Sequence, residues 1–133
     1  SIFDLTGDTQ PVTLDVSGKP VRCVRFSPCG SKIFTAADDG RIGVYDVERG
    51  ALIMSFCGHQ GSVLCVAACP DRVSVASGGG EGAVRLWDQR MQDCTRTFSE
   101  HTDQVWAVDF DDSGTRLLSG GDDGRLQLYQ RSS

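Results

Sequence analysis

Ser119, His101 and Asp123 are the residue types of a hydrolase triad. In such a triad, a carboxylate orients a histidine that takes the proton of a serine nucleophile. Ser77 and His59 occupy the same positions earlier in the chain, again with an acidic residue, and a structural role explains this recurrence better than a single active site does. No segment resembles the turn that exposes a nucleophile. The sequence therefore predicts structural roles for these residues and a chain that is not an enzyme.

Other patterns could bind small ligands. Residues 78–82 are rich in glycine, but a phosphate loop leads into a helix, whereas these residues lead into the strand-like run Ala83–Trp87. Asp38-Asp39-Gly40 and Asp122-Asp123-Gly124 lack the spaced ligands and the distal glutamate of a calcium loop. The six cysteines form no Cys-x-x-Cys pair, which argues against a zinc site. We expect turns at these positions, and no metal or cofactor.

The chain is built from three copies of one unit, spaced by 42 residues. Val21, Val63 and Val105 align at this spacing, with no insertion or deletion. A fixed period of this size indicates a modular array, in which each unit buries its apolar faces against its neighbours. Further sets that align in the same way are Thr35, Ser77 and Ser119; Asp39, Glu81 and Asp123; and Tyr45, Trp87 and Tyr129.

The middle unit contains four short segments with the composition of β-strands. Ser62–Cys69 is apolar at nearly every position, which is typical of a strand buried on both faces. Val73–Ser77, Ala83–Trp87 and Cys94–Phe98 follow, and Glu81-Gly82 between two of them is a hairpin signal. The sequence therefore predicts an all-β protein, whose four-stranded antiparallel sheets stack radially.

Gly58-His59 before the first strand and Trp87-Asp88 at the end of the third carry a resemblance to the WD-repeat β-propeller family. The resemblance covers nearly the whole chain. It implies three four-stranded antiparallel blades, which belong to a larger propeller or to a ring made with a second copy. The expected boundaries are 1–16 for the tail of a truncated repeat and its outer strand, 17–58 and 59–100 for two WD repeats, and 101–133 for a C-terminal repeat that lacks its own outer strand.

The resemblance also implies a buried hydrogen-bond network in each blade, running from Trp to Ser or Thr, then to His and Asp. No unit has the complete set, so we expect looser networks, at about 1–3 kcal/mol for each orphaned group. Glu81 is one methylene longer than aspartate, and Tyr129 offers a hydroxyl in place of an indole N–H. The residues carried over are Trp87, Ser77, His59 and Glu81; Tyr129, Ser119, His101 and Asp123; and Tyr45, Thr35 and Asp39, with Ser17 where histidine is expected.

Partners of WD-repeat proteins commonly dock on the face made by the loops before the first strands and by the turns between the second and third strands. Trp106 is the informative residue there, because it is either a core residue or an exposed one. If it is exposed, Trp106 and Arg22 are expected to be binding hot spots. The resemblance places on this face Arg22, Asp38, Leu64, Gln104, Trp106 and Asp122.

A narrower resemblance concerns the WD-repeat subunit shared by the superkiller (Ski) complex of RNA decay and the polymerase-associated-factor complex of transcription elongation. Asp103-Gln104-Val105-Trp106, Gly120–Asp123 and the final Tyr129 resemble that subunit's C-terminal blades. This implies a non-catalytic scaffold for helical-repeat and helicase subunits, in cytoplasm and nucleus. The alternative is a generic adaptor, such as a ubiquitin-ligase substrate receptor or a histone-tail reader.

Composition narrows the class of protein further. The chain has 133 residues and a net charge of −5, with 13 Lys and Arg against 18 Asp and Glu, so it lacks the basic stripe of a nucleic-acid binder. No apolar run is long enough for a membrane span. Its cysteines do not have the density of a disulfide-stapled secreted domain. These features predict a protein with reduced thiols inside the cell, which binds neither nucleic acid nor membrane.

Three blades cannot close a ring. Pro11–Val16 has the position of an outer strand that follows the truncated repeat ending at Phe3, whereas the last unit has no outer strand after Tyr129. Either the three blades are part of a larger propeller, or two copies form one ring. In the second case, Val12–Val16 of one copy would complete the last blade of the other.

Overall fold

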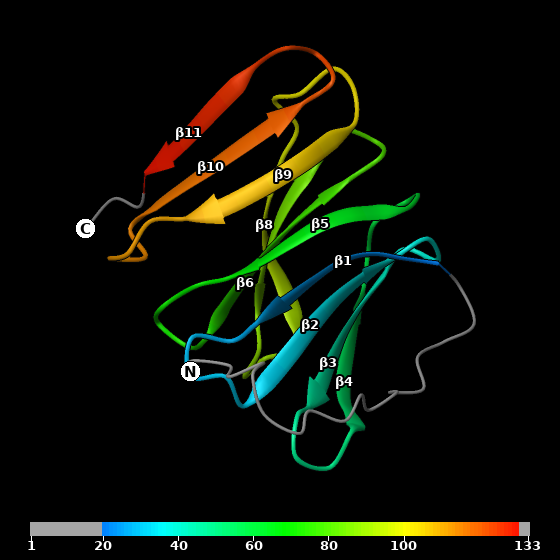
Figure 1. Cartoon of the computed structure of the whole chain (residues 1–133). Helices are drawn as coiled ribbons and strands as arrows, with labels where there is room; N and C mark the ends of the chain where they lie inside the picture. Colours follow the sequence, from blue (N-terminus) through cyan, green and yellow to red (C-terminus); the bar gives the residue numbers. More distant parts are fainter. Residues whose placement is uncertain (1–19, 131–133) are drawn as a thin grey trace, which may run out of the picture.

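The computed structural model describes residues 20–130, and every regular element within that range is a β-strand (Figure 1). The first sheet contains β1 (Val21–Phe26), β2 (Lys32–Ala37), β3 (Arg41–Asp46) and β4 (Ala51–Cys57). The second contains β5 (Val63–Ala68), β6 (Ser74–Gly79), β7 (Val84–Asp88) and β8 (Asp93–Phe98). The third contains β9 (Val105–Phe110), β10 (Arg116–Gly121) and β11 (Leu126–Gln130).

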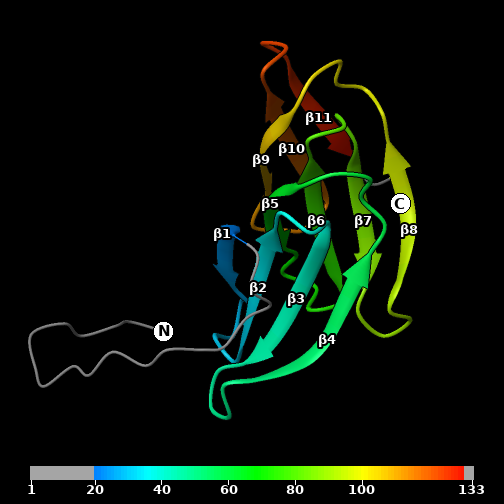
Figure 2. The ribbon, with the colours of Figure 1, turned by 90° about the vertical axis from the view of Figure 1, so that its right-hand side faces the viewer.

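Each sheet is an antiparallel meander whose strands follow one another in chain order. The three first strands lie on one side of the molecule, and the outer strands β4 and β8 lie on the opposite side (Figure 2). Strand β5 contacts both β1 and β9, so the sheets fan out from a shared inner edge. This is the radial stack of antiparallel blades that the sequence predicts.

Glycine sets the turn between the second and third strand of each sheet. Gly40, Gly82 and Gly124 all have positive φ angles, of 80°, 89° and 76°, which other residues rarely adopt. At Gly82, a Cβ atom would also lie 2.8 Å from the carbonyl oxygen of His101, which belongs to the loop before β9. The hairpins at Gly40 and Gly82 are therefore packed against the following loop, and this contact needs a residue without a side chain, whereas a Cβ at Gly124 would meet no described atom within 4 Å.

The two interfaces between sheets form the core. Large side chains of the first sheet meet β-branched and aromatic side chains of the second, and the second sheet meets the third in the same way. Cys65 adds a weak link, because its thiol donates to the backbone oxygen of Val105 on the next sheet at 3.6 Å. The first interface is made by Phe34, Ala36, Ile42, Val44, Phe56, Val63, Val66, Val75 and Trp87, and the second by Cys65, Ala67, Ala76, Val84, Val105, Val108 and Leu117.

The outward faces of the first and third sheets remain uncovered by the described residues. Val24 of β1 is 60% exposed, although Val66 and Val108 at the equivalent positions are 0% and 2% exposed. Leu126 and Leu128 of β11 are likewise exposed. The side chain at one repeat position is therefore buried where a neighbouring sheet covers it and exposed to solvent where none does.

All six cysteines are free thiols in the described part of the chain. Cys65 and Cys69 are buried and Cys23 is half-buried, as expected of small apolar residues. Burial raises the pKa of the Cys65 thiol to about 12, which keeps it protonated and unreactive.

Residues 20–130 contain no helix that is long and apolar enough to cross a membrane. They also contain no group of three or more His, Cys, Asp or Glu side chains that could hold a metal ion. The expected outer strand at Pro11–Val16, the repeat tail at Phe3 and the substituted position Ser17 lie outside the described residues.

Candidate partner-binding face

The loops before the inner strands and the turns between second and third strands meet at one end of the fan. In each sheet a backbone N–H after the second strand donates to a carbonyl before the first strand, at 2.9–3.0 Å. The donors and acceptors are Asp38 and Pro20, Gly80 and Ser62, and Asp122 and Gln104. We call this end the turn face. The residues predicted to lie on it are Arg22, Asp38, Leu64, Gln104, Trp106 and Asp122.

Each inner strand has a β-bulge on the turn face. The bulge falls at Arg22 in β1, at Leu64 in β5 and at Trp106 in β9, where the pairing with the second strand skips one residue. A bulge bends a strand and re-aims one side chain out of the regular alternation. Sequence patterns alone did not reveal these bulges, and the only signal for them is that three unlike residues occupy one repeat position.

The three bulge residues differ in how much surface they present. Trp106 is 47% exposed among the described residues, on a sheet whose outward face no described residue covers. The side chain of Arg22 is also 47% exposed. Leu64 is only 7% exposed and presents little surface to a partner. The first and last sheets therefore supply most of the exposed side-chain surface at these positions.

Arg22 forms a two-pronged ion pair with Asp38 on the turn face. Its Nε and one terminal nitrogen donate to the two carboxylate oxygens at 2.7 and 2.8 Å. The hydrogen bond with Asp38 and its negative charge raise the pKa of Arg22. Asp122 occupies the position of Asp38 in the third sheet, where Trp106 stands in place of the arginine.

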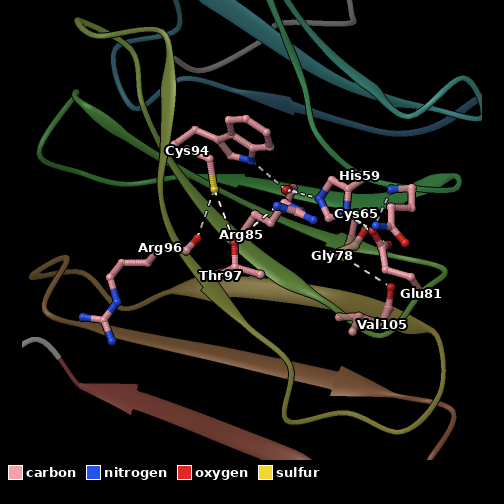
Figure 3. Close-up of polar contacts among 12 residues, drawn as sticks. His59, Cys65, Gly78, Glu81, Arg85, Cys94, Arg96, Thr97 and Val105 are labelled. Atoms are coloured by element: carbon pink, nitrogen blue, oxygen red, sulfur yellow. Dashed lines mark hydrogen bonds and ion pairs between the residues drawn. The ribbon is translucent and has the colours of Figure 1, made fainter.

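A continuous hydrogen-bond network lies behind the turn face in the second sheet. The indole N–H of Trp87 donates to Ser77 Oγ at 2.8 Å, and Ser77 Oγ lies 2.6 Å from His59 Nε2. His59 Nδ1 is 3.1 Å from both oxygens of Glu81 (Figure 3). Since the Glu81 carboxylate can only accept, Nδ1 carries a proton. Burial lowers the pKa of His59 and favours the neutral ring, so Nε2 accepts the hydroxyl proton of Ser77.

The network at Glu81 keeps its contact with the histidine, although glutamate is one methylene longer than aspartate. The longer side chain reaches the same histidine nitrogen from a position nearer to solvent, with 21% of its side chain exposed against 3% for Asp123. Its carboxylate also accepts the backbone N–H of Gln60 at 2.9 Å. The shift of the carboxylate toward the surface keeps the bonds to His59 and Gln60, but Glu81 does not accept the backbone N–H two residues on, as Asp123 does from Arg125 at 3.0 Å.

The network of the third sheet uses Tyr129 in place of a tryptophan. His101 Nδ1 lies 3.0 and 3.1 Å from the oxygens of Asp123, and His101 Nε2 lies 2.8 Å from Ser119 Oγ. Ser119 donates to the Tyr129 hydroxyl at 3.2 Å, a longer contact than the one from Trp87. A hydroxyl can donate or accept, so Tyr129 does not impose a direction on the network as an indole does.

The first sheet differs from the other two at this network. Thr35 and Tyr45 are buried, and Asp39 accepts the backbone N–H of Arg41 at 3.1 Å. Ala37 stands where the other sheets have glycine. At Gly79 of the second sheet a Cβ would collide with the Glu81 carboxylate and the His59 ring. The methyl group of Ala37 therefore fills space that a histidine and its acid need.

The serine–histidine–acid contacts have the connectivity of a triad, but their burial does not suit catalysis. Ser77 and Ser119 are 0% and 1% exposed, so a substrate has no route to either hydroxyl in this fold. The indole of Trp87 also donates to Ser77 Oγ, so one acceptor position of that oxygen is already occupied. The contacts can hold loops and strands in register, which is a structural role.

Near the second network, Arg85 had no role in the sequence analysis, and Gly58 served there only as a mark of the family resemblance. A Cβ at Gly58 would lie 2.7 Å from the Trp87 ring, so glycine is needed there for the indole to reach its place, and smaller Tyr129 tolerates Glu100 at the equivalent position. The positive charge of Arg85 helps to lower the pKa of His59, although burial is the larger cause.

A family model described as "WD domain, G-beta repeat" matches residues 8–46, 50–88 and 92–130. The chain belongs to the WD40 repeat family. Each fully described WD40 repeat starts with the outer strand of one sheet and continues through three strands of the next; residues 50–88 span β4 to β7. Repeat and sheet are thus offset by one strand, so the repeats at residues 50–88 and 92–130 each join two neighbouring blades covalently.

Similar proteins support the same assignment. "WD repeat-containing protein 1" of Bos taurus is 35% identical over 72 residues, which are 52% of this chain and 12% of that protein. "Protein groucho" of Drosophila melanogaster is 28% identical over 81 residues, which are 59% of this chain and 11% of that protein. The chain therefore spans about an eighth of the length of these WD40 relatives.

Solved structures show the same blades. The chain described as "Structure of U3-55K" superposes with a TM-score of 0.83 at 27% identity, covering 88% of this chain and 38% of that one. A chain of the "Crystal Structure of Mitotic Checkpoint Complex" gives a TM-score of 0.79 at 29% identity, covering 85% of this chain and 35% of that one. WD40 proteins are generally scaffolds for protein complexes.

The free energy of unfolding of this WD40 chain is expected to fall in two stages as the pH is lowered from 7. Burial lowers the pKa of His59, so below about pH 6.5 the unfolded chain takes up a proton that the folded chain resists. Burial alone would raise the pKa of Asp123, but hydrogen bonds from Arg125, His101 and Thr102 lower it to about 2. Stability from Asp123 is therefore present above about pH 3.9 and is lost as the pH falls toward 2.

Urea unfolding across this pH range measures both stages. The variant His59→Gln should lack the first stage. Asp123→Asn should make the second stage smaller without removing it, because the pKa values of Asp71, Glu81, Asp88 and Asp111 are lowered as well. A wild-type free energy of unfolding that stays constant between pH 7 and 5 would show that His59 is not held neutral by the fold.

Proposed function

We propose that this chain is a non-catalytic scaffold that binds other protein subunits through its turn face. The observation that carries the proposal is the exposure of Trp106 on a β-bulge, in a fold where the other tryptophan is buried and hydrogen-bonded. An exposed tryptophan on a rigid strand is well suited to anchor a partner, because it supplies a large contact area at low entropy cost.

We further propose that the assembly is the Ski complex or the polymerase-associated-factor complex, with roles in RNA decay or transcription elongation. The support comes from Asp103-Gln104-Val105-Trp106, Gly120–Asp123 and Tyr129, which resemble the shared WD-repeat subunit of those complexes. The partners would be helical-repeat and helicase subunits, and the chain would act in cytoplasm and nucleus.

A second candidate is an adaptor in transcription that is independent of both complexes, such as a histone-tail reader. It is favoured by similarity to "Transcription factor unc-37" of Caenorhabditis elegans, which is 27% identical over 79 residues, and to "Protein groucho". A ubiquitin-ligase substrate receptor remains the other form of adaptor. The proteins captured from cell extract separate these possibilities: exosome-associated helicase subunits, chromatin proteins or ligase components.

Replacing Trp106 with alanine is expected to abolish capture of the partner and leave the fold intact. Nearly half of the side chain is exposed, so its loss removes an anchor and little of the core. The measurement is affinity capture from extract with mass spectrometry, alongside circular dichroism of the purified variant.

Met91→Ala is the matched control for this experiment. Met91 is 67% exposed and lies in the turn between β7 and β8, away from the turn face, so its replacement should leave capture unchanged. Full capture by the Trp106→Ala variant, or its unfolding, would contradict the proposal.

A further inference from the structure

The first and third sheets carry the same acidic position on the turn face, with different neighbours. In the first sheet the bulge residue Arg22 neutralises Asp38 through two short hydrogen bonds. In the third sheet the equivalent bulge residue is Trp106, and the equivalent acid is Asp122. The internal repeat thus shows what this position accepts when it is filled: a guanidinium group.

Asp122 lacks such a group in the described part of the chain. Its side chain is exposed and forms no hydrogen bond or ion pair with residues 20–130. Arg125 is close along the chain but makes no ion pair with it. The backbone N–H of Asp122 is tied to Gln104, which fixes the carboxylate-bearing residue beside the strand that carries Trp106.

We propose that Trp106 and Asp122 together bind an arginine side chain of a protein partner. This inference rests on the proposed function, because it names the group that docks on the turn face. The partner's guanidinium would take the place that Arg22 holds in the first sheet, donating two N–H groups to the carboxylate of Asp122. Its flat face would lie against the indole of Trp106.

The chemistry selects arginine over other side chains. A guanidinium can form a two-pronged bond to a carboxylate and stack on an aromatic ring at the same time, whereas an ammonium is a compact point charge. Asp103, in the loop before β9, adds a further negative charge on the turn face. A neutral side chain would leave the Asp122 carboxylate without a counter-charge at the interface.

A small probe tests the site without knowledge of the partner. Nα-acetyl-arginine amide is titrated into the intact chain, and the indole N–H signal of Trp106 is followed by NMR, with the buried Trp87 as internal reference. The citrulline analogue, which has nearly the same shape and no charge, is the ligand control. We expect the arginine probe to shift the Trp106 signal and to bind about tenfold more weakly to Asp122→Asn.

Asp112→Asn is the matched protein control, because it removes the same charge from an exposed residue in the loop between β9 and β10. It should bind the probe as the wild type does. Equal binding of arginine and citrulline probes, or an unchanged affinity in Asp122→Asn, would overturn the proposal.

Two exchanges between the repeats test the same inference from the other direction. Trp106→Arg should form an internal pair with Asp122, as Arg22 does with Asp38, and so lose the probe and the partner. Arg22→Trp should leave Asp38 without its arginine and create a second probe site, so that two probes bind each chain. If Arg22→Trp still binds one probe, the repeat comparison does not describe the site.

Partner capture separates this inference from the proposed function. If Trp106→Ala loses the partner while Asp122→Asn keeps it, the turn face is a docking surface and the arginine site is wrong. If both variants keep the partner, both proposals fail.

Discussion

Replacing Trp87 with alanine is expected to lower the free energy of unfolding by about 3–5 kcal/mol. The indole is 3% exposed and stacks on Phe56 of the preceding sheet, with ring centres 5.3 Å apart. It also donates the hydrogen bond that begins the network through Ser77 and His59. Its removal therefore opens a cavity between two sheets and leaves a buried hydroxyl without its donor, and such losses are comparable with the whole stability of a small domain.

Chemical denaturation at neutral pH measures this effect, and the second tryptophan of the chain provides the control. Trp106→Ala changes the same residue type at 47% exposure, so its effect should stay within about 0.5 kcal/mol. Similar losses for the two variants would mean that Trp87 does not join the first two sheets as described.

The fold could be predicted from the sequence because its evidence is repeated. Val21, Val63 and Val105 keep one spacing, and each Asp-Gly or Glu-Gly pair marks a hairpin on its own. The same pattern of strand and hairpin residues thus occurs three times at one spacing, and each copy supports the others. The described sheets follow that register, with four strands in the first and second and three in the third.

The turn face was less accessible to sequence reasoning. Whether Trp106 is buried depends on the bulge in β9, and the bulge depends on how β9 pairs with β10. Arg22 and Leu64 share its repeat position, but one is exposed and the other buried, so comparing repeats could not decide the matter. Exposure here is a property of the tertiary structure, whereas the hairpins are local.

The polar networks could be predicted in part. Their residues follow from the resemblance, but which hydrogen bonds form depends on the space around each side chain as well as on residue type. Glu81 keeps its bond to His59 because the surface leaves room for a longer side chain. The first sheet has Ala37 at the position of Gly79 and Gly121, and its repeat has Ser17 in place of the histidine. The histidine and the glycine that makes room for it are thus lost together.

Placing an aspartate at Val66 is expected to unfold the chain, whereas the same change at Val24 is expected to be mild. The two valines occupy one repeat position. Val66 is fully buried against the first sheet, so Val66→Asp would bury an unpaired carboxylate, with a loss of about 4 kcal/mol or more. Val24 is 60% exposed, and Val24→Asp should lose less than about 1 kcal/mol. Denaturant unfolding of the two variants measures the difference, which is due to the neighbouring sheet alone.

The same pair of variants tests whether two copies complete one ring. In such a ring, the exposed flank of β1 and β2 would be covered by the β10–β11 flank of the other copy, as the second sheet covers the first within the chain. Val24→Asp would then bury a charge at a joint between copies. It should convert a dimer seen by light scattering into a monomer, and remove any dependence of unfolding on protein concentration.

If the wild-type chain is already a stable monomer, the two-copy ring is excluded and Val24→Asp should leave the size unchanged. In that case we expect the uncovered flanks to pack against further blades, because an apolar sheet face of this kind is stable only when a similar sheet covers it.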